Sequence, residues 1–344
     1  MYILQNQTQF LNDFLSRVKN AKKRVWVQAM IVESGQVLDQ FIAQLKNNTN
    51  LNSLDIQIQY DWITNKSVHG ETPLLPVLSK DEREYARKLH IRNYLMFKKL
   101  RGLNATVTLL NAPKVFPHIL PITGRNHTKI YIIDDTAWIG GCNFMDKSFT
   151  KFDFMLCSND PQYVNTLAQH FKLVNKNKPK TNTRIELNNQ DIFLADNGKR
   201  GKSIIYKEAL NLINQSIKEI IFISQFTPTG KILESMLEKS KQGVTVRVVT
   251  SPSDHIHFNK LPHTIPHNIF IQKTKNLTKF HLHHIKKPVH AKIILTDADS
   301  LLIGSHNYVD TGVYLGTEEI AILTKNYQIC TQLKGIVETQ IKER

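Results

Sequence analysis

The chain of 344 residues is long enough for about two domains, and its 41% hydrophobic and 22% charged residues are typical of a folded globular protein. Its three cysteines have no metal-ligand spacing, which argues against a disulfide framework and indicates reduced thiols in a cytoplasmic compartment. The formal net charge of +16 favours an anionic partner: nucleic acid, anionic lipid headgroups or phosphate esters.

The predicted elements follow the same order in both halves of the chain. Apolar residues at three-to-four spacing predict helices over 8–24, 35–45, 206–217 and 230–241. Alternating or continuous apolar runs predict strands over 24–28, 54–60, 219–223 and 244–249. Because helices alternate with strands, we expect a mostly parallel sheet in each half.

The repeated order indicates a duplicated domain, because its period is far longer than that of a solenoid repeat. We place the first domain at residues 1–173 and the second at 203–344. Residues 174–202, rich in Asn, Lys and Gly, are interpreted as the connection, with a short strand possible at Ile192–Leu194.

Three stretches do not follow the repeat. Residues 81–101 predict a basic helix, which is either a surface helix with a core face or an interfacial helix over anionic lipid. Residues 113–123 form an apolar, proline-broken loop that is either a buried connector or a lip touching acyl chains.

The third stretch, residues 252–290, holds eight of the fourteen histidines and is interpreted as a long loop. A metal site at His281, His283 and His284 is the alternative, but no cysteine and few carboxylates accompany them. We therefore predict no metal and no cofactor.

One motif occurs twice, at residues 127–143 and 290–307. Each copy reads H-x-K-x(4)-D, followed by a small-residue turn and an asparagine, and each asparagine is followed three residues later by an aspartate. The matching residues are His127, Lys129, Asp134 and Asn143 in the first copy, and His290, Lys292, Asp297 and Asn307 in the second.

The spacing within each copy predicts a strand that ends in a turn. Side chains at i and i+2 of a strand share a face, so each histidine and its lysine are expected to point the same way. The alternate residues are expected to face a core. Turns at 134–136 and 297–299 lead into return strands that bring the asparagines back. Each half thus offers an imidazole, an ammonium and an amide.

The doubled motif resembles the signature of the phospholipase D superfamily. The lead-in Gly124–His127 and the turn Ile139–Asn143 are most similar to the cardiolipin synthase branch. The resemblance implies an α/β fold of two tandem phospholipase D-like α-β-α sandwich domains with pseudo-twofold symmetry. It also implies one shared active site, formed within a monomer, that needs no metal.

The resemblance also implies roles for the site residues. His127 would be the nucleophile that forms a phosphohistidine, and His290 the general acid and then base. Two lysines and two asparagines, Lys129, Lys292, Asn143 and Asn307, would stabilise charge on the phosphoryl oxygens.

A carboxylate downstream of each asparagine is implied to orient a histidine. Asp153 and Glu319 fit this role, although Glu318 leaves the second register uncertain by one residue. The motif aspartates, Asp134 and Asp297, are expected to orient loops. A serine usual in the family matches Ser148 in the first half, whereas the second half has Gly312.

Three functions remain open at this stage. The first is a phosphatidyltransferase that converts phosphatidylglycerol to cardiolipin, supported by the Gly-Arg-Asn-His lead-in, the apolar loop and the basic helix. The second is a metal-independent endonuclease, which the positive charge would also suit. The third is a non-enzymatic scaffold with a degenerate site.

The expected location follows from what the sequence lacks. The first residues show no signal-peptide pattern, and no stretch reaches about 18 uninterrupted apolar residues. We therefore expect a cytoplasmic protein, peripheral at the inner face of the cell membrane, with anionic phospholipid as its partner and nucleic acid as the partner under the second reading.

Overall fold

The structure, a computed structural model, describes residues 2–66, 80–112, 123–174, 181–251 and 260–343. The chain divides into two compact units, one of Met1–Thr150 with Phe154–Pro179 and one of Lys151–Asp153 with Lys180–Arg344. Three residues of the first half, Lys151–Asp153, thus belong to the second unit. The predicted apolar loop lies outside the described residues except for Thr123.

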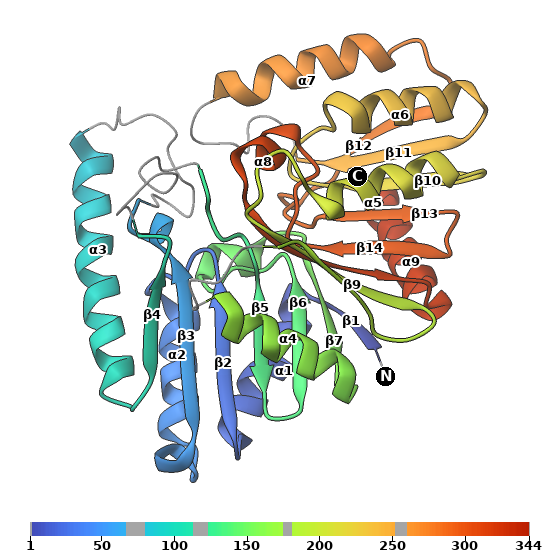
Figure 1. The fold of residues 1–344 in the computed structure, drawn as a ribbon. Helices are drawn as coiled ribbons and strands as arrows, with labels where there is room; N and C mark the ends of the chain where they lie inside the picture. Colours follow the sequence, from blue (N-terminus) through green and yellow to red (C-terminus); the bar gives the residue numbers. More distant parts are fainter. Residues whose placement is uncertain (1, 67–79, 113–122, 175–180, 252–259, 344) are drawn as a thin grey trace. The chain divides into compact units, whose positions relative to one another are not determined.

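The first unit is built on a seven-stranded sheet of order β1-β7-β6-β5-β2-β3-β4 (Figure 1). Its strands are β1 (Tyr2–Asn6), β2 (Arg24–Ala29), β3 (Asp55–Asp61), β4 (Thr106–Leu110), β5 (Ile130–Ile133), β6 (Thr136–Gly140) and β7 (Phe154–Ser158). Its helices are α1 (Gln7–Asn20), α2 (Gln36–Lys46), α3 (Lys80–Arg101) and α4 (Pro161–Val174), with short turns of 3-10 helix at Leu51–Ser53, Trp62–Lys66 and Asp146–Thr150.

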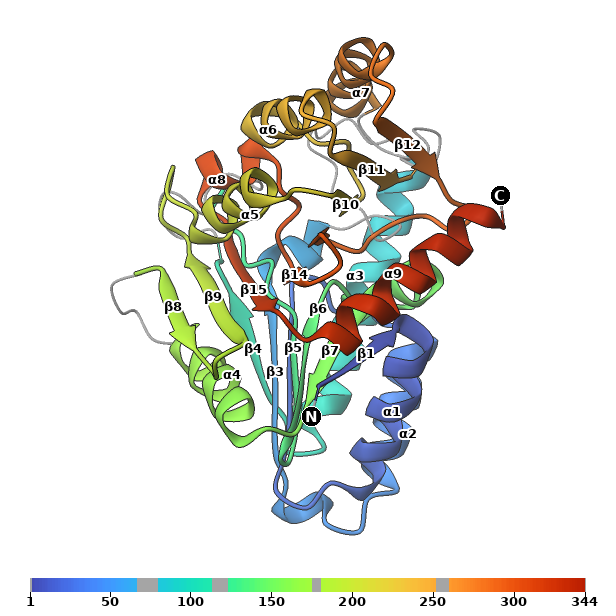
Figure 2. The same ribbon diagram turned by 90° about the vertical axis from the view of Figure 1, so that its right-hand side faces the viewer.

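Helices cover both faces of this sheet. Figures 1 and 2 show α1 and α2 on one face and α4 on the other. Phe10, Phe14 and Phe41 of α1 and α2 pack in one buried cluster with Tyr131 of β5. On the opposite face Trp26 stacks on Phe171 of α4, with ring centroids 5.0 Å apart.

The second unit has an eight-stranded sheet of order β12-β11-β10-β13-β14-β15-β9-β8. Its strands are β8 (Thr183–Glu186), β9 (Asp191–Asn197), β10 (Glu219–Ile223), β11 (Thr245–Thr250), β12 (Phe280–His284), β13 (Ile293–Thr296), β14 (Ser300–Gly304) and β15 (Glu318–Thr324). Its helices are α5 (Ile204–Gln215), α6 (Gly230–Lys241), α7 (Lys260–Thr274), α8 (Asp310–Leu315) and α9 (Tyr327–Lys342). Figure 2 shows α5 and α6 on one face of this sheet and α9 on the other.

The prediction of a mostly parallel sheet in each half is wrong. Among the described strands, only β2, β3 and β4 run parallel in the first sheet and only β10, β11 and β12 in the second, and the other pairs are antiparallel. The reason is the turn after each motif strand. Two residues separate β5 from β6, and a connection that short joins only antiparallel strands.

Two other sequence interpretations change. The histidine-rich stretch is not one long loop, because it contains helix α7 and strand β12, while His255 and His257 lie outside the described residues. The stretch interpreted as a connection contributes β8 and β9, and β9 includes the expected strand at Ile192–Leu194. β9 pairs with β15 along its whole length, so it belongs to the second sheet.

A glycine ends the return strand of each unit, where a neighbouring strand approaches closely. A Cβ on Gly140 would lie 2.2 Å from the carbonyl oxygen of Phe154, and one on Gly304 would lie 2.1 Å from that of Ile320. Only glycine fits such contacts without moving the backbone. These positions therefore fix where the loops that carry the two asparagines leave their sheets.

Candidate active site

Each motif histidine lies just before a strand. β5 begins at Ile130 and β13 at Ile293, so the predicted strands start three residues later than His127 and His290. The residues of β5 are buried on both faces, which corrects the expectation of a single core face. The predicted turns are present, and Asp134 and Asp297 adopt left-handed backbone angles (φ 48° and 53°).

The motif lysines are buried next to their histidines. Lys129 is 2% exposed and Lys292 is 3% exposed, and each Nζ donates a hydrogen bond to the carbonyl oxygen of the histidine two residues earlier. Both copies therefore hold the ammonium in the same local geometry. A positive charge removed from water acts more strongly on a nearby anion than an exposed one.

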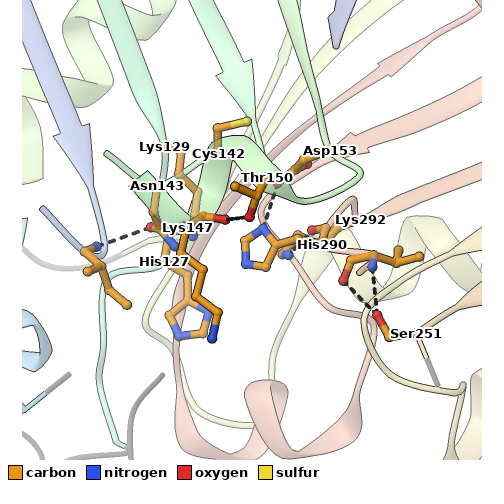
Figure 3. A network of polar contacts seen from close by, with 12 residues as sticks. His127, Lys129, Cys142, Asn143, Lys147, Thr150, Asp153, Ser251, His290 and Lys292 are labelled. Carbon is orange, nitrogen blue, oxygen red and sulfur yellow. Dashed lines mark hydrogen bonds and ion pairs between the residues drawn. The ribbon is translucent and has the colours of Figure 1, made fainter. Parts of the chain in front are cut away.

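The two asparagines are held differently. Asn143 is buried, and its Oδ1 accepts from the backbone N–H of Ile31 at 3.2 Å, which leaves its amide N–H groups as donors (Figure 3). In the second unit, Oδ1 of Asn307 is buried and makes no hydrogen bond with the described part of the chain. The backbone carbonyl of Asn307 accepts instead from Ser224 Oγ at 3.3 Å.

Asp153, which was expected to orient a histidine, contacts the ring of His290. Its Oδ2 lies 2.7 Å from Nδ1 of His290, and the carboxylate is 1% exposed (Figure 3). An ionised carboxylate can only accept, so Nδ1 carries the proton, and Nε2 is the nitrogen available for chemistry. The carbonyl of Phe152 also accepts from the backbone N–H groups of His290 (2.9 Å) and Ala291 (3.0 Å).

Strand registers identify the counterpart of Asp153 in the second motif. Gly140 pairs with Met155 and Gly304 pairs with Ala321, so the position equivalent to Asp153 is Glu319 rather than Glu318. The Glu319 carboxylate is 2% exposed and accepts a hydrogen bond from Ser305 Oγ.

A second carboxylate lies beside Glu319. Asp196 occupies the paired position on β9, and burial, with a smaller repulsion from Glu319, raises its pKa to about 6 against the hydrogen bonds from Ser203 and Ile204. The carboxylate neighbouring Glu319 therefore carries its charge at an energetic cost.

The motif aspartates lie at the opposite ends of their strands from the histidines. Asp134 accepts from the backbone N–H groups of Lys22, Lys23 and Arg24 at 2.7–3.1 Å. Asp297 accepts in the same way from three N–H groups at 2.8–3.0 Å, those of residues 217–219. Burial would raise the pKa of Asp297, but these donors and Ser216 hold it below its ordinary value. Both carboxylates orient loops that lead into a neighbouring strand.

Three further residues support the site, and the sequence analysis assigned a structural role to none of them. Asp146, three residues after Asn143, accepts from Gln36 N (2.9 Å) and Val37 N (2.8 Å) and so caps α2. Its repetition as Asp310 was the available signal. Ser148, matched to the family's serine, is buried and its Oγ makes no hydrogen bond with described residues. Asp61, at the end of β3, makes a buried ion pair with Arg125, and only its position at a strand end could have pointed to it.

The histidine cluster does not form a metal site within the described ranges. No three His, Cys, Asp or Glu side chains there converge on a point that could hold a metal ion. His281 and His283 lie on β12 with ring centroids 6.3 Å apart, and Nδ1 of His284 lies 3.4 Å from the carbonyl oxygen of Thr250.

Comparisons with known proteins agree with the motif and the fold. A family model described as "Cardiolipin synthase, PLD-like domain" matches residues 14–174 and 209–340. No curated protein matches the chain.

Solved structures share the fold at low identity. Phosphatidylserine synthase from Haemophilus influenzae Rd KW20 aligns over 99% of this chain and 86% of its own, with 13% identity and a TM-score of 0.72. Polyphosphate kinase from Porphyromonas gingivalis aligns over 99% of this chain and 47% of its own, with 10% identity and a TM-score of 0.62. The family match spans most of both units and includes both motifs, so the chain belongs to the cardiolipin synthase, phospholipase D-like domain family of the phospholipase D superfamily.

Proposed function

We propose that this protein is a phosphatidyltransferase of the cardiolipin synthase type, which transfers a phosphatidyl group from one phosphatidylglycerol to the hydroxyl of another. The observation that carries the proposal is the pairing of His290, in the second copy of a doubled motif, with the buried carboxylate of Asp153, which lies downstream of the first copy. This pairing prepares an imidazole for proton transfer at Nε2.

The proposed reaction uses one histidine for covalent catalysis and the other for proton transfer. His127 attacks the phosphorus and a P–N bond forms. The P–O bond to the leaving glycerol breaks as His290, which enters this step as the imidazolium with a proton on each ring nitrogen, gives its Nε2 proton to that oxygen. The acceptor hydroxyl then loses its proton to His290 and attacks the phosphohistidine, so the P–N bond breaks. Lys129 and Lys292 stabilise the charge that builds on the phosphoryl oxygens.

Helix α3 is proposed to dock the protein on an anionic membrane. Its buried face includes Leu89, Met96 and Phe97, and on the other side Ile91, Tyr94 and Leu95 are 46–61% exposed. None of the helices in the described ranges is long and apolar enough to cross a bilayer. An exposed apolar stripe flanked by cations is suited to the headgroup region, and we propose the inner face of the cell membrane.

The test compares two substrates under one condition. Purified protein is incubated in EDTA with phosphatidylglycerol vesicles and, separately, with single-stranded DNA, and the same assays are run on His127→Asn and His290→Asn variants. Cardiolipin formation by the wild type, lost in both variants, is the expected result. DNA cleavage without cardiolipin formation would replace the proposal with the endonuclease. Inactivity on both substrates would favour the non-enzymatic scaffold.

A further inference from the structure

The residue before each motif histidine donates its backbone N–H to a side chain at the end of a parallel strand. In the first unit, Asn126 N donates to Asp61 Oδ2 at 2.7 Å, and Asp61 is the last residue of β3. In the second, Val289 N donates to Ser251 Oγ at 2.7 Å, one residue after the end of β11 (Figure 3). The same position therefore holds an acid in one copy and a neutral hydroxyl in the other.

Asp61 is the centre of a buried polar network. It accepts from Ile63 N (2.9 Å), Asn111 Nδ2 (3.0 Å) and Arg125 Nη1 (3.1 Å) as well as from Asn126 N. All four partners are donors, which is the pattern of an ionised carboxylate. Burial raises the pKa of Asp61, and Arg125 opposes this by favouring the charged form.

Arg125 ties the same network to the segment before His127. Its Nε donates to the carbonyl oxygen of Thr123 at 3.0 Å, and its guanidinium lies 5.8 Å from the ring centroid of Trp62. The side chains of Arg125 and Asp61 are 2% and 0% exposed. A guanidinium buried in this way supports the chain rather than meeting a substrate phosphate.

Asn126 extends the network past the histidine. Its Oδ1 accepts from Thr128 N at 3.0 Å and from Thr128 Oγ1 at 2.6 Å, a turn that spans His127. Both neighbours of His127 are thus fixed through side chains of the first unit. In the second unit, Val289 bonds to Ser251, and the backbone N–H of His290 donates to the carbonyl oxygen of Phe152.

We infer that Asp61, Arg125 and Asn126 are positioning residues for His127, and that Ser251 is a positioning residue for His290. This inference rests on the proposed function, because it assigns the network to the placement of a reacting imidazole. The two histidines share a motif, but a buried ion pair holds the residue before His127 and a neutral hydroxyl holds the residue before His290. Loss of the network should therefore affect His127 selectively.

The first measurement is kinetic, on a small soluble phosphodiester that needs no membrane. Asp61→Asn and Arg125→Met should each lower kcat about 100-fold, the usual effect of displacing a reacting group by about 1 Å, with KM changed less than about threefold. Arg125→Lys keeps the charge opposite Asp61 and should recover part of the lost kcat. Asn126→Ala introduces no buried charge and should still lower kcat about 10-fold, so it serves if the ion-pair variants do not fold.

The second measurement does not depend on turnover. Diethyl pyrocarbonate modifies imidazoles, and peptide mass spectrometry gives separate rates for His127 and His290. Network variants should change the rate of His127 several-fold and leave that of His290 unchanged, and the matched control Ser251→Ala should do the reverse. Folded variants with kcat within about twofold of wild type, or with both histidines affected equally, would overturn the inference. If the wild type cleaves no phosphodiester, the proposed function fails while the modification rates still decide the positioning role.

Discussion

Replacing Asp153 by Asn is the sharpest single test of how His290 works. The change preserves size but removes the carboxylate that lies 2.7 Å from Nδ1. A hydrogen bond to a charged group contributes about 1.5–3 kcal/mol, and each 1.36 kcal/mol is a tenfold change in rate, so kcat should fall about 10- to 150-fold. The asparagine amide can also donate to Nδ1 and so favour the tautomer with the proton on Nε2, which would deepen the loss.

The assay is kcat and KM on a soluble phosphodiester, together with a thermal melt. Glu338→Gln is the matched control, because it removes a carboxylate of the same unit that is 39% exposed and pairs with Arg247 at 3.7 Å. It should leave kcat unchanged. An Asp153→Asn protein that melts like wild type and keeps kcat within about twofold would refute the view that this carboxylate prepares His290.

Three further predictions concern charge. Activity should survive EDTA, because Lys129 and Lys292 supply the positive charge that a metal would; complete loss restored by Mg²⁺ or Zn²⁺ would show otherwise. The fold lowers the pKa of Asp297, so the ionised carboxylate stabilises the protein above its unfolded pKa. Asp297→Asn should therefore lower the melting temperature at pH 7, and the gap in melting temperature from wild type should shrink as the pH falls below about 4. A gap that does not depend on pH would count against this role for the carboxylate. Reversing three exposed cations of α3 to Glu should weaken co-sedimentation with phosphatidylglycerol vesicles, since each cation near such a surface contributes about 1 kcal/mol, while cleavage of a soluble phosphodiester is retained. The reversed residues are Arg87, Lys88 and Arg92. The control reverses three exposed lysines of α1, the loop after α1 and α2, which are Lys19, Lys22 and Lys46, and this variant should bind the vesicles as wild type does.

Local sequence patterns predicted part of the fold. Helical spacing and apolar runs predicted α1, α2, α5 and α6 and the strands β2, β3, β10 and β11, and the doubled motif predicted the hairpins β5–β6 and β13–β14. Strand direction was predicted wrongly although its signal was present, because two residues between Ile133 and Thr136 allow only a hairpin. Helix α7 was missed because Pro266 and two separate histidines, His263 and His267, interrupt its apolar pattern.

The supporting network could not be predicted from local pattern. Asp61 and Arg125 are 64 residues apart in the chain, and each by itself reads as an ordinary charged residue. They meet only because folding brings the end of β3 and the segment before β5 to the same end of the sheet. The register of Glu319 likewise depended on the pairing of β14 with β15, which the sequence left uncertain by one residue.

The motif residues have the same local geometry in the two units, whereas the side chains that hold the segment before each histidine differ. Each holds its lysine on the carbonyl of its own histidine and ends its return strand at a glycine. The difference comes behind the motifs, where the carboxylate of Asp61 holds the residue before His127 and the hydroxyl of Ser251 holds the residue before His290. A reaction through a phosphohistidine needs one imidazole that forms a bond to phosphorus and one that exchanges protons. Under the proposed function, identical motifs can divide this work because their supports differ, so exchanging the supports should alter the division of roles more than exchanging residues within the motifs.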